Sequence, residues 1–134
     1  MRTALVTTLA MLVLAGCGGG TRGGSYAQVL STTLASVSRP ASLDSGSLAT
    51  LSHDYSAAAD RLERLRPPAA VAQPHAQMVA SLRAYAVDLQ TAATLTTNAP
   101  AFATEMARAQ TDAQAWTAAF DQIRARGYAT FSAS

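Results

Sequence analysis

Lysine is absent from the sequence, and all ten basic side chains are arginines. We interpret the missing lysine as the codon bias of a high-GC genome rather than as a sign of function. Once Arg2, which lies in the leader described below, is set aside, nine arginines stand against eight acids. A nucleic-acid-binding domain presents a basic face, so this near-neutral balance argues against nucleic acid as a partner.

Cysteine and histidine are scarce, with one cysteine, Cys17, and two histidines, His53 and His75. A single cysteine forms no internal disulfide, so a folded domain must be held by packing alone. Neither histidine follows a Glu at the spacing used by di-iron bundles, and zinc needs more ligands than this. Covalent haem, Gly-x-Ser-x-Gly and phosphate-loop motifs are missing from the sequence. We therefore expect a non-enzymatic protein with no catalytic residues, metal or cofactor.

What the chain does contain at its start is a three-part leader. Arg2 precedes an apolar run over residues 4–14, and small residues follow it. This layout is typical of a secretory signal and is too short for a mature membrane span. The tetrapeptide Leu14-Ala15-Gly16-Cys17 resembles the lipobox of bacterial lipoproteins. The alternative interpretation of Cys17 is a free thiol at the end of a buried apolar segment.

The lipobox resemblance implies cleavage before Cys17, diacylglycerol on the Cys17 sulfur and acylation, such as palmitate, on the new amino terminus. The partner would then be a membrane, reached through the lipid anchor at Cys17. Localisation would be extracytoplasmic, on the bacterial cell membrane or on the outer membrane if the host has one. A single acyl chain binds only marginally, whereas two or three chains anchor a protein stably.

The rest of the chain divides into three parts behind the signal peptide of residues 1–16. Residues 17–24 comprise the lipidated cysteine and a Gly-rich, flexible tether. Residues 25–128 form the folded domain, and residues 129–134 form a frayed C-terminal tail. The domain is long enough for one hydrophobic core.

Apolar residues recur at helical spacing in four segments, and no strand pattern is present. We predict a short helix over 25–38 capped by Ser25, a second helix from the Asp44 cap to Pro67-Pro68, a third opening at Pro74, and a fourth from Pro100 to Gly127. Four amphipathic helices with short connections predict an all-α, antiparallel up-down four-helix bundle. If the first helix does not complete it, a three-helix bundle remains. The predicted apolar seams are Tyr26, Val29, Leu30, Thr33, Leu34 and Val37; Leu48, Leu51, Tyr55, Ala58, Leu62 and Leu65; His75, Met78, Leu82, Tyr85, Leu89, Ala92 and Thr96; and Phe102, Met106, Ala109, Ala113, Trp116, Phe120 and Ile123.

His75 is the one weak candidate for cofactor binding, because it lies on a predicted seam. It could ligate a metal, bind haem together with Met78 or Met106, or carry a proton. The plainer interpretation is that it hydrogen-bonds the turn between the second and third helices. His53 is expected to face solvent or the rim of the bundle.

The acids are spread out, and the closest pairs are Asp60 with Glu63 and Asp112 with Asp121. The seams place all four on outer faces, where we expect them to pair with Arg61, Arg64, Arg108 or Arg124 rather than to act as acid and base.

Arginines also gather over residues 61–66 at the end of the second helix. Cations there complement the helix dipole. The sharper alternative is a contact with anionic lipid or a cell-wall polymer.

The segment from Leu62 to Leu89, with its Leu-x-x-Leu, Pro-Pro and His sequence, is similar to small uncharacterised lipoproteins of high-GC bacteria, a resemblance that implies no activity. The leading hypothesis is a lipid-anchored envelope protein that binds a protein or cell-wall partner or has a structural role. The second is a bundle that holds haem, a metal or a small apolar molecule between its helices, and a hydrolase is a distant third.

Overall fold

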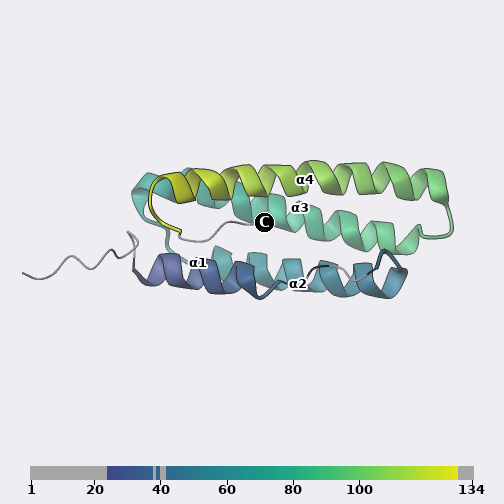
Figure 1. Cartoon of the computed structure of the whole chain (residues 1–134), viewed down its shortest axis with the longest axis horizontal. Helices are drawn as coiled ribbons and strands as arrows, with labels where there is room; N and C mark the ends of the chain where they lie inside the picture. The colour runs from purple at the N-terminus through teal and green to yellow at the C-terminus, as the bar shows by residue number, and fades with distance from the viewer. Residues whose placement is uncertain (1–23, 38, 40–41, 130–134) are drawn as a thin grey trace, which may run out of the picture.

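The computed structural model describes residues 24–37, 39 and 42–129, and all regular structure in that part of the chain is helical. The elements are α1 (Ser25–Ala35), α2 (Ser45–Glu63), the short 3-10 helix η1 (Ala69–Val71), α3 (Ala72–Thr94) and α4 (Ala99–Ala125). The three long helices run antiparallel, and α1 lies along one half of the bundle (Figure 1). The predicted all-α four-helix bundle with a short first helix is confirmed.

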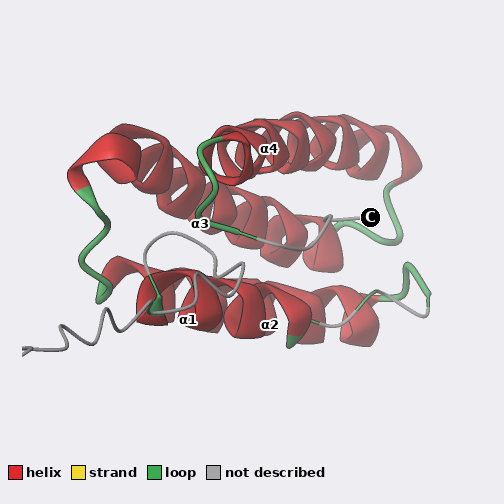
Figure 2. Cartoon of the chain, turned by 60° about the vertical axis from the view of Figure 1, so that its left-hand side comes forward, coloured by secondary structure: helices red, strands yellow, loops and turns green. Residues whose placement is uncertain are grey.

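The two ends of the bundle have different neighbours. We call the end where α1 begins, α2 turns into α3 and α4 finishes the entry end; the opposite end, where α2 and α4 begin, is the far end (Figures 1 and 2). The predicted signal peptide of residues 1–16, Cys17 and the rest of the tether before Gly24 lie outside the described residues, as do residues 130–134. Among the described helices, none combines the length and the apolar character needed to cross a bilayer.

The core consists of two clusters, one at each end. The entry-end cluster includes buried residues from every helix, among them Leu30 of α1, Leu62 of α2, Met78 of α3 and Phe120 of α4. The far-end cluster is built from α2, α3 and α4 alone. Many of the buried positions are alanines, which let helix axes approach closely: Ala58, Ala59, Ala86, Ala92, Ala93, Ala109 and Ala119. The short α1 therefore completes the bundle only near the entry end.

Local signals fix several helix ends where the sequence predicts them. The Asp44 carboxylate accepts a hydrogen bond from the Ser47 backbone N–H at 2.8 Å, so it caps α2. Gly127 has a φ of 83°, a conformation that favours glycine. The Tyr128 N–H returns to the Ile123 carbonyl at 3.2 Å, and the Gly127 N–H returns to Arg124. These two bonds form the Schellman motif that ends α4.

Three boundary predictions are wrong in detail. Ser25 is the first residue of α1 rather than its cap; Gly24 holds the cap position and makes no side-chain hydrogen bond. The helix stops at Ala35, short of the predicted residue 38, and Val29 on the predicted seam is 38% exposed. Pro74 is the third residue of α3, because the η1 turn runs directly into this helix.

The predicted C-terminal tail also begins too early. Ala129 is buried and belongs to the entry-end cluster, so the folded domain extends one residue past the predicted boundary at 128. The Schellman motif turns the chain back over the end of the bundle, and this places the residue after Tyr128 against the core.

The Phe120 side chain is fully buried at the entry end, so its removal tests the core directly. We expect Phe120→Ala to lower the free energy of unfolding by about 3–5 kcal/mol, because the truncation leaves a cavity. Urea denaturation followed by helical circular dichroism measures this change. Val87→Ala is the matched control, since Val87 is 63% exposed and its loss should change stability little. Equal effects of the two variants would contradict the described core.

Candidate functional site

His75 joins three helices through its ring. It is only 5% exposed, and the Tyr26 hydroxyl of α1 lies 2.9 Å from its Nδ1. Its Nε2 lies 2.9 Å from the Leu62 carbonyl of α2. The Tyr26 and His75 rings also touch, with centroids 5.5 Å apart. The plainer interpretation of His75, a hydrogen bond to the turn between the second and third helices, agrees with this geometry.

The partners of His75 determine where its proton lies. A carbonyl only accepts hydrogen bonds, so Nε2 must donate to Leu62. Nδ1 is then the acceptor of a neutral imidazole, and the Tyr26 hydroxyl donates to it. Burial lowers the pKa of His75, although the Leu62 carbonyl acts in the opposite direction. Burial likewise raises the pKa of Tyr26 to about 12. Both groups are therefore held neutral, and metal or haem ligation would require breaking one of the two bonds.

The methionines considered as haem partners of His75 lie in different places. Met78 is fully buried in the entry-end cluster, whereas Met106 is partly buried against the far-end cluster. The two clusters occupy opposite ends of the bundle, so Met106 does not accompany His75. His53 is exposed, as predicted, with an 84% accessible side chain that lies 3.7 Å from Asp54.

A group of carboxyls between α3 and α4 does not follow from the predicted seams. Asp88 of α3 shares hydrogen bonds with Asp112 and Glu105 of α4. Burial, together with these two acids, raises the pKa of Asp88 to about 6. Glu105 is buried and also contacts Arg108 at 3.3 Å. A proton on Asp88 relieves its repulsion by the two neighbouring acids.

Asp112 is therefore not on a purely solvated face paired with arginine, as predicted, but lies against Asp88. The signal in the sequence is Glu105, which stands four residues before the buried Ala109 and so shares its face of α4. The predicted seam follows one stripe, whereas α4 uses a wider face to contact α3.

The other predicted acid pair is also organised differently. Asp60 and Glu63 both bind Arg83 of α3, at 2.9 and 2.6 Å, rather than the arginines of their own helix. Hydrogen bonds from Arg83 lower the pKa of Glu63. Asp121 does pair with Arg124, as predicted, at 2.9 Å. The Arg83 pairs connect α2 with α3 at the surface, whereas the Asp121 pair lies within α4, and none of these acids is poised for acid–base catalysis.

Aromatic side chains fill the middle of the bundle. The Tyr55 and Tyr85 rings meet edge to face with centroids 4.7 Å apart, and the Trp116 ring lies 6.3 Å from Tyr55. Trp116 is partly exposed, but its Nε1–H is buried without a hydrogen-bond partner. An unpaired buried donor costs about 1–3 kcal/mol. This indole is the one described side chain whose buried N–H or O–H lacks an acceptor.

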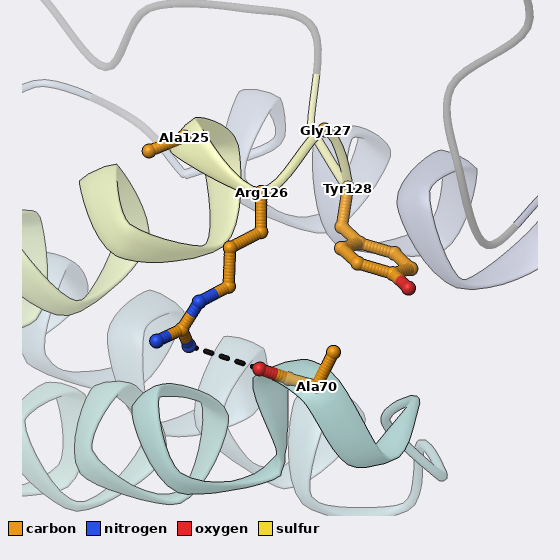
Figure 3. A pocket seen from close by; sticks show the side chains of 5 residues that line it. All are labelled: Ala70, Ala125, Arg126, Gly127 and Tyr128. Atoms are coloured by element: carbon orange, nitrogen blue, oxygen red, sulfur yellow. Dashed lines mark hydrogen bonds between the residues drawn. The ribbon is translucent and has the colours of Figure 1, made fainter.

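Two hollows lie at the entry end. One, of about 440 Å³, is lined by Ala70, Ala125, Arg126, Gly127 and Tyr128. Figure 3 shows Arg126 reaching across it to the Ala70 carbonyl, a hydrogen bond of 2.9 Å. The second, of about 340 Å³, lies between α2 and α3 beside His75 and Arg83. Both are open to solvent, and neither is lined by a nucleophile with an adjacent base.

No group of three or more His, Cys, Asp or Glu side chains in the described part of the chain could hold a metal ion. Comparisons with protein families, curated proteins and solved structures found no match to this chain. The lipid attachment predicted at Cys17 falls outside the described residues. What the geometry defines is a buried polar junction at His75 and a basic, arginine-rich entry end.

The hydroxyl of Tyr26 tests the junction. We expect Tyr26→Phe to destabilise the fold by about 1–3 kcal/mol, because Nδ1 of His75 would remain buried without a donor. Tyr128→Phe is the matched control: it removes a hydroxyl from the ring that packs edge-on against Tyr26 but leaves the junction intact. Thermal and urea unfolding measure both, and an unchanged stability for Tyr26→Phe would contradict the hydrogen bond.

The raised pKa of Asp88 predicts a pH dependence. The folded protein holds this proton up to about pH 6, whereas an unfolded aspartate loses it near pH 4. The stabilisation is thus complete below pH 4 and is lost as the pH rises through 6, by about 1–2 kcal/mol once solvent screening of this partly exposed group is included. Unfolding measured between pH 4 and 7 should show this decline, and Asp88→Asn should flatten it. Asp121→Asn, at a surface pair, should leave the decline in place.

Proposed function

We propose that the protein is a membrane-anchored, extracytoplasmic lipoprotein with a non-enzymatic interaction or structural role in the cell envelope. The observation that carries this proposal is the tetrapeptide Leu14-Ala15-Gly16-Cys17 at the end of an apolar leader. Two or three acyl chains on Cys17 would anchor the protein, because each buried methylene contributes about 0.8 kcal/mol.

Two features of the bundle support an anchored domain. The described helices pack around two clusters of buried apolar side chains, so they form a folded body that an anchor could carry. Its first helix begins at Ser25, directly after the Gly-rich stretch of residues 18–24. A folded body that follows a Gly-rich stretch of this length could turn toward a partner near the membrane surface, because Gly-rich sequences generally behave as flexible linkers.

The side chains that could take part in catalysis are held in hydrogen bonds and ion pairs. Both ring nitrogens of His75 are hydrogen-bonded, and Asp60 and Glu63 are held by Arg83. These contacts favour an interaction or structural role over a hydrolase, since a hydrolase needs a poised acid and base.

The unpaired Nε1–H of Trp116 favours a second candidate function, a bundle that binds a small molecule. A ligand with an oxygen acceptor, seated beside Tyr55 and Trp116, would satisfy this donor. Native mass spectrometry of protein isolated from its own host distinguishes the two functions. Extra mass that disappears in Trp116→Phe would support the ligand, and the bare polypeptide mass would overturn it.

Lipidation of Cys17 tests the main proposal. We expect the full chain, expressed in a bacterial host fed an alkyne fatty acid, to become labelled and to partition into the membrane. Cys17→Ser should abolish both, because no other thiol is present in the sequence. Gly18→Ala is the matched control, as it changes the neighbouring residue and keeps the thiol. A wild-type chain that stays unlabelled would refute the proposal.

A further inference from the structure

Charge is distributed unevenly along the bundle. Six of the eight described arginines lie nearer the entry end: Arg61, Arg64, Arg66, Arg83, Arg124 and Arg126. Only three acids accompany them there: Asp60, Glu63 and Asp121. The rest of the bundle has the reverse excess, with Arg39 and Arg108 against Asp44, Asp88 and Glu105 in the far half and Asp54 and Asp112 at the midpoints of α2 and α4. The described part of the chain therefore has an uneven charge distribution along its length, with the positive excess at the entry end.

The acids of the entry end are already engaged. Asp60 and Glu63 bind Arg83, and Asp121 binds Arg124. The remaining arginines, Arg61, Arg64, Arg66 and Arg126, are exposed. Arg126 projects across the end of the bundle to η1, as Figure 3 shows. We call these four exposed arginines, which lie at and just beyond the ends of α2 and α4, the arginine face.

Helix dipoles account for only part of this arrangement. Cations complement the carboxyl end of a helix within its last turn, and Arg61 occupies that position in α2. Arg66 lies beyond the end of α2, where the dipole effect has fallen off. Interaction with the helix dipoles therefore does not account for all of the arginines at the entry end.

The arginine face lies at the end where the chain enters the bundle. Gly24 precedes α1 there, and the seven residues from Gly18 to Gly24 separate α1 from Cys17. A flexible Gly-rich chain of that length has an end-to-end distance of about 15 Å. If Cys17 carries the anchor, the arginine face is held within about two Debye lengths of the lipid surface at physiological salt.

We propose that the arginine face docks on anionic lipid headgroups, so that the bundle stands upright with its acidic far end pointing away from the membrane. This inference rests on the proposed anchor at Cys17, which keeps the bundle at the surface while the charges set its orientation. Each arginine near an anionic leaflet gains about 1 kcal/mol, a fivefold preference. Guanidinium groups also bind phosphate oxygens in a two-pronged geometry. The acids of the far half are repelled by the same surface, which strengthens the orientation.

Energy transfer between the far end and the membrane tests the orientation. The lipidated protein, with a fluorophore on the single accessible cysteine of Thr97→Cys, is reconstituted into vesicles that contain acceptor-labelled headgroups. Thr97 is exposed in the α3–α4 turn, and α4 is about 40 Å long. We expect transfer to be weaker, on the order of twofold, in vesicles with phosphatidylglycerol than in pure phosphatidylcholine. High salt should remove the difference.

The combined variant Arg61→Gln, Arg64→Gln and Arg66→Gln should also remove the difference. The matched control Ser45→Glu, Ala103→Glu and Gln110→Glu lowers the net charge equally at exposed positions of the other half, and it should keep the difference. Equal transfer in both lipids for acylated wild type, or an unchanged difference in the arginine variant, would overturn the docking. Intact mass without acyl chains would instead overturn the anchor itself, so the two failures are distinguishable.

Discussion

The entry end of the bundle depends on the hydrogen bonds of the neutral imidazole of His75. α1 has only 11 residues and no side-chain cap, and isolated helices of that length are marginal in water. It is held by its buried face, including Leu30, and by the Tyr26 hydroxyl, which His75 connects to the end of α2. Because both ring nitrogens are used, one side chain joins α1, α2 and α3 without leaving a buried polar atom unpaired. The first helix is therefore fixed to the other two by this buried polar junction as well as by its apolar face.

Much of the fold follows from the sequence because local chemistry determines it. The Asp44 cap and Gly127 each satisfy a requirement of one helix end, so neither depends on distant contacts. The seams of α2 and α3 are regular enough to identify their buried faces. The end of α1 at Ala35 is not predictable in this way, because no glycine or proline marks that position in the sequence.

The candidate site was less predictable, because it depends on pairs of helices. The link between Arg83 and the acids of α2, and the group of carboxyls around Asp88, each require the relative rotation of two helices. A single helical stripe gives no information on that rotation. His75 could be placed on a seam from its spacing, but its partner Tyr26 is 49 residues away and was recognisable only as an apolar position. The distribution of arginines was readable locally at residues 61–66, while its continuation through Arg124 and Arg126 required the fold.

The position of α1 has a mechanical consequence. Tension carried by the residues before Gly24 enters the bundle at the first turn of α1, and this turn lies at the end from which the pull would come. A load along the long axis would slide α1 lengthwise past α2 and α3 rather than peel it away turn by turn. Tyr26, Leu30 and Thr33, its buried contacts, would then bear the load together rather than in succession. A short helix docked in this direction therefore resists force better than its length suggests, because the hydrogen bond of the Tyr26 hydroxyl and the apolar contacts of α1 share the load.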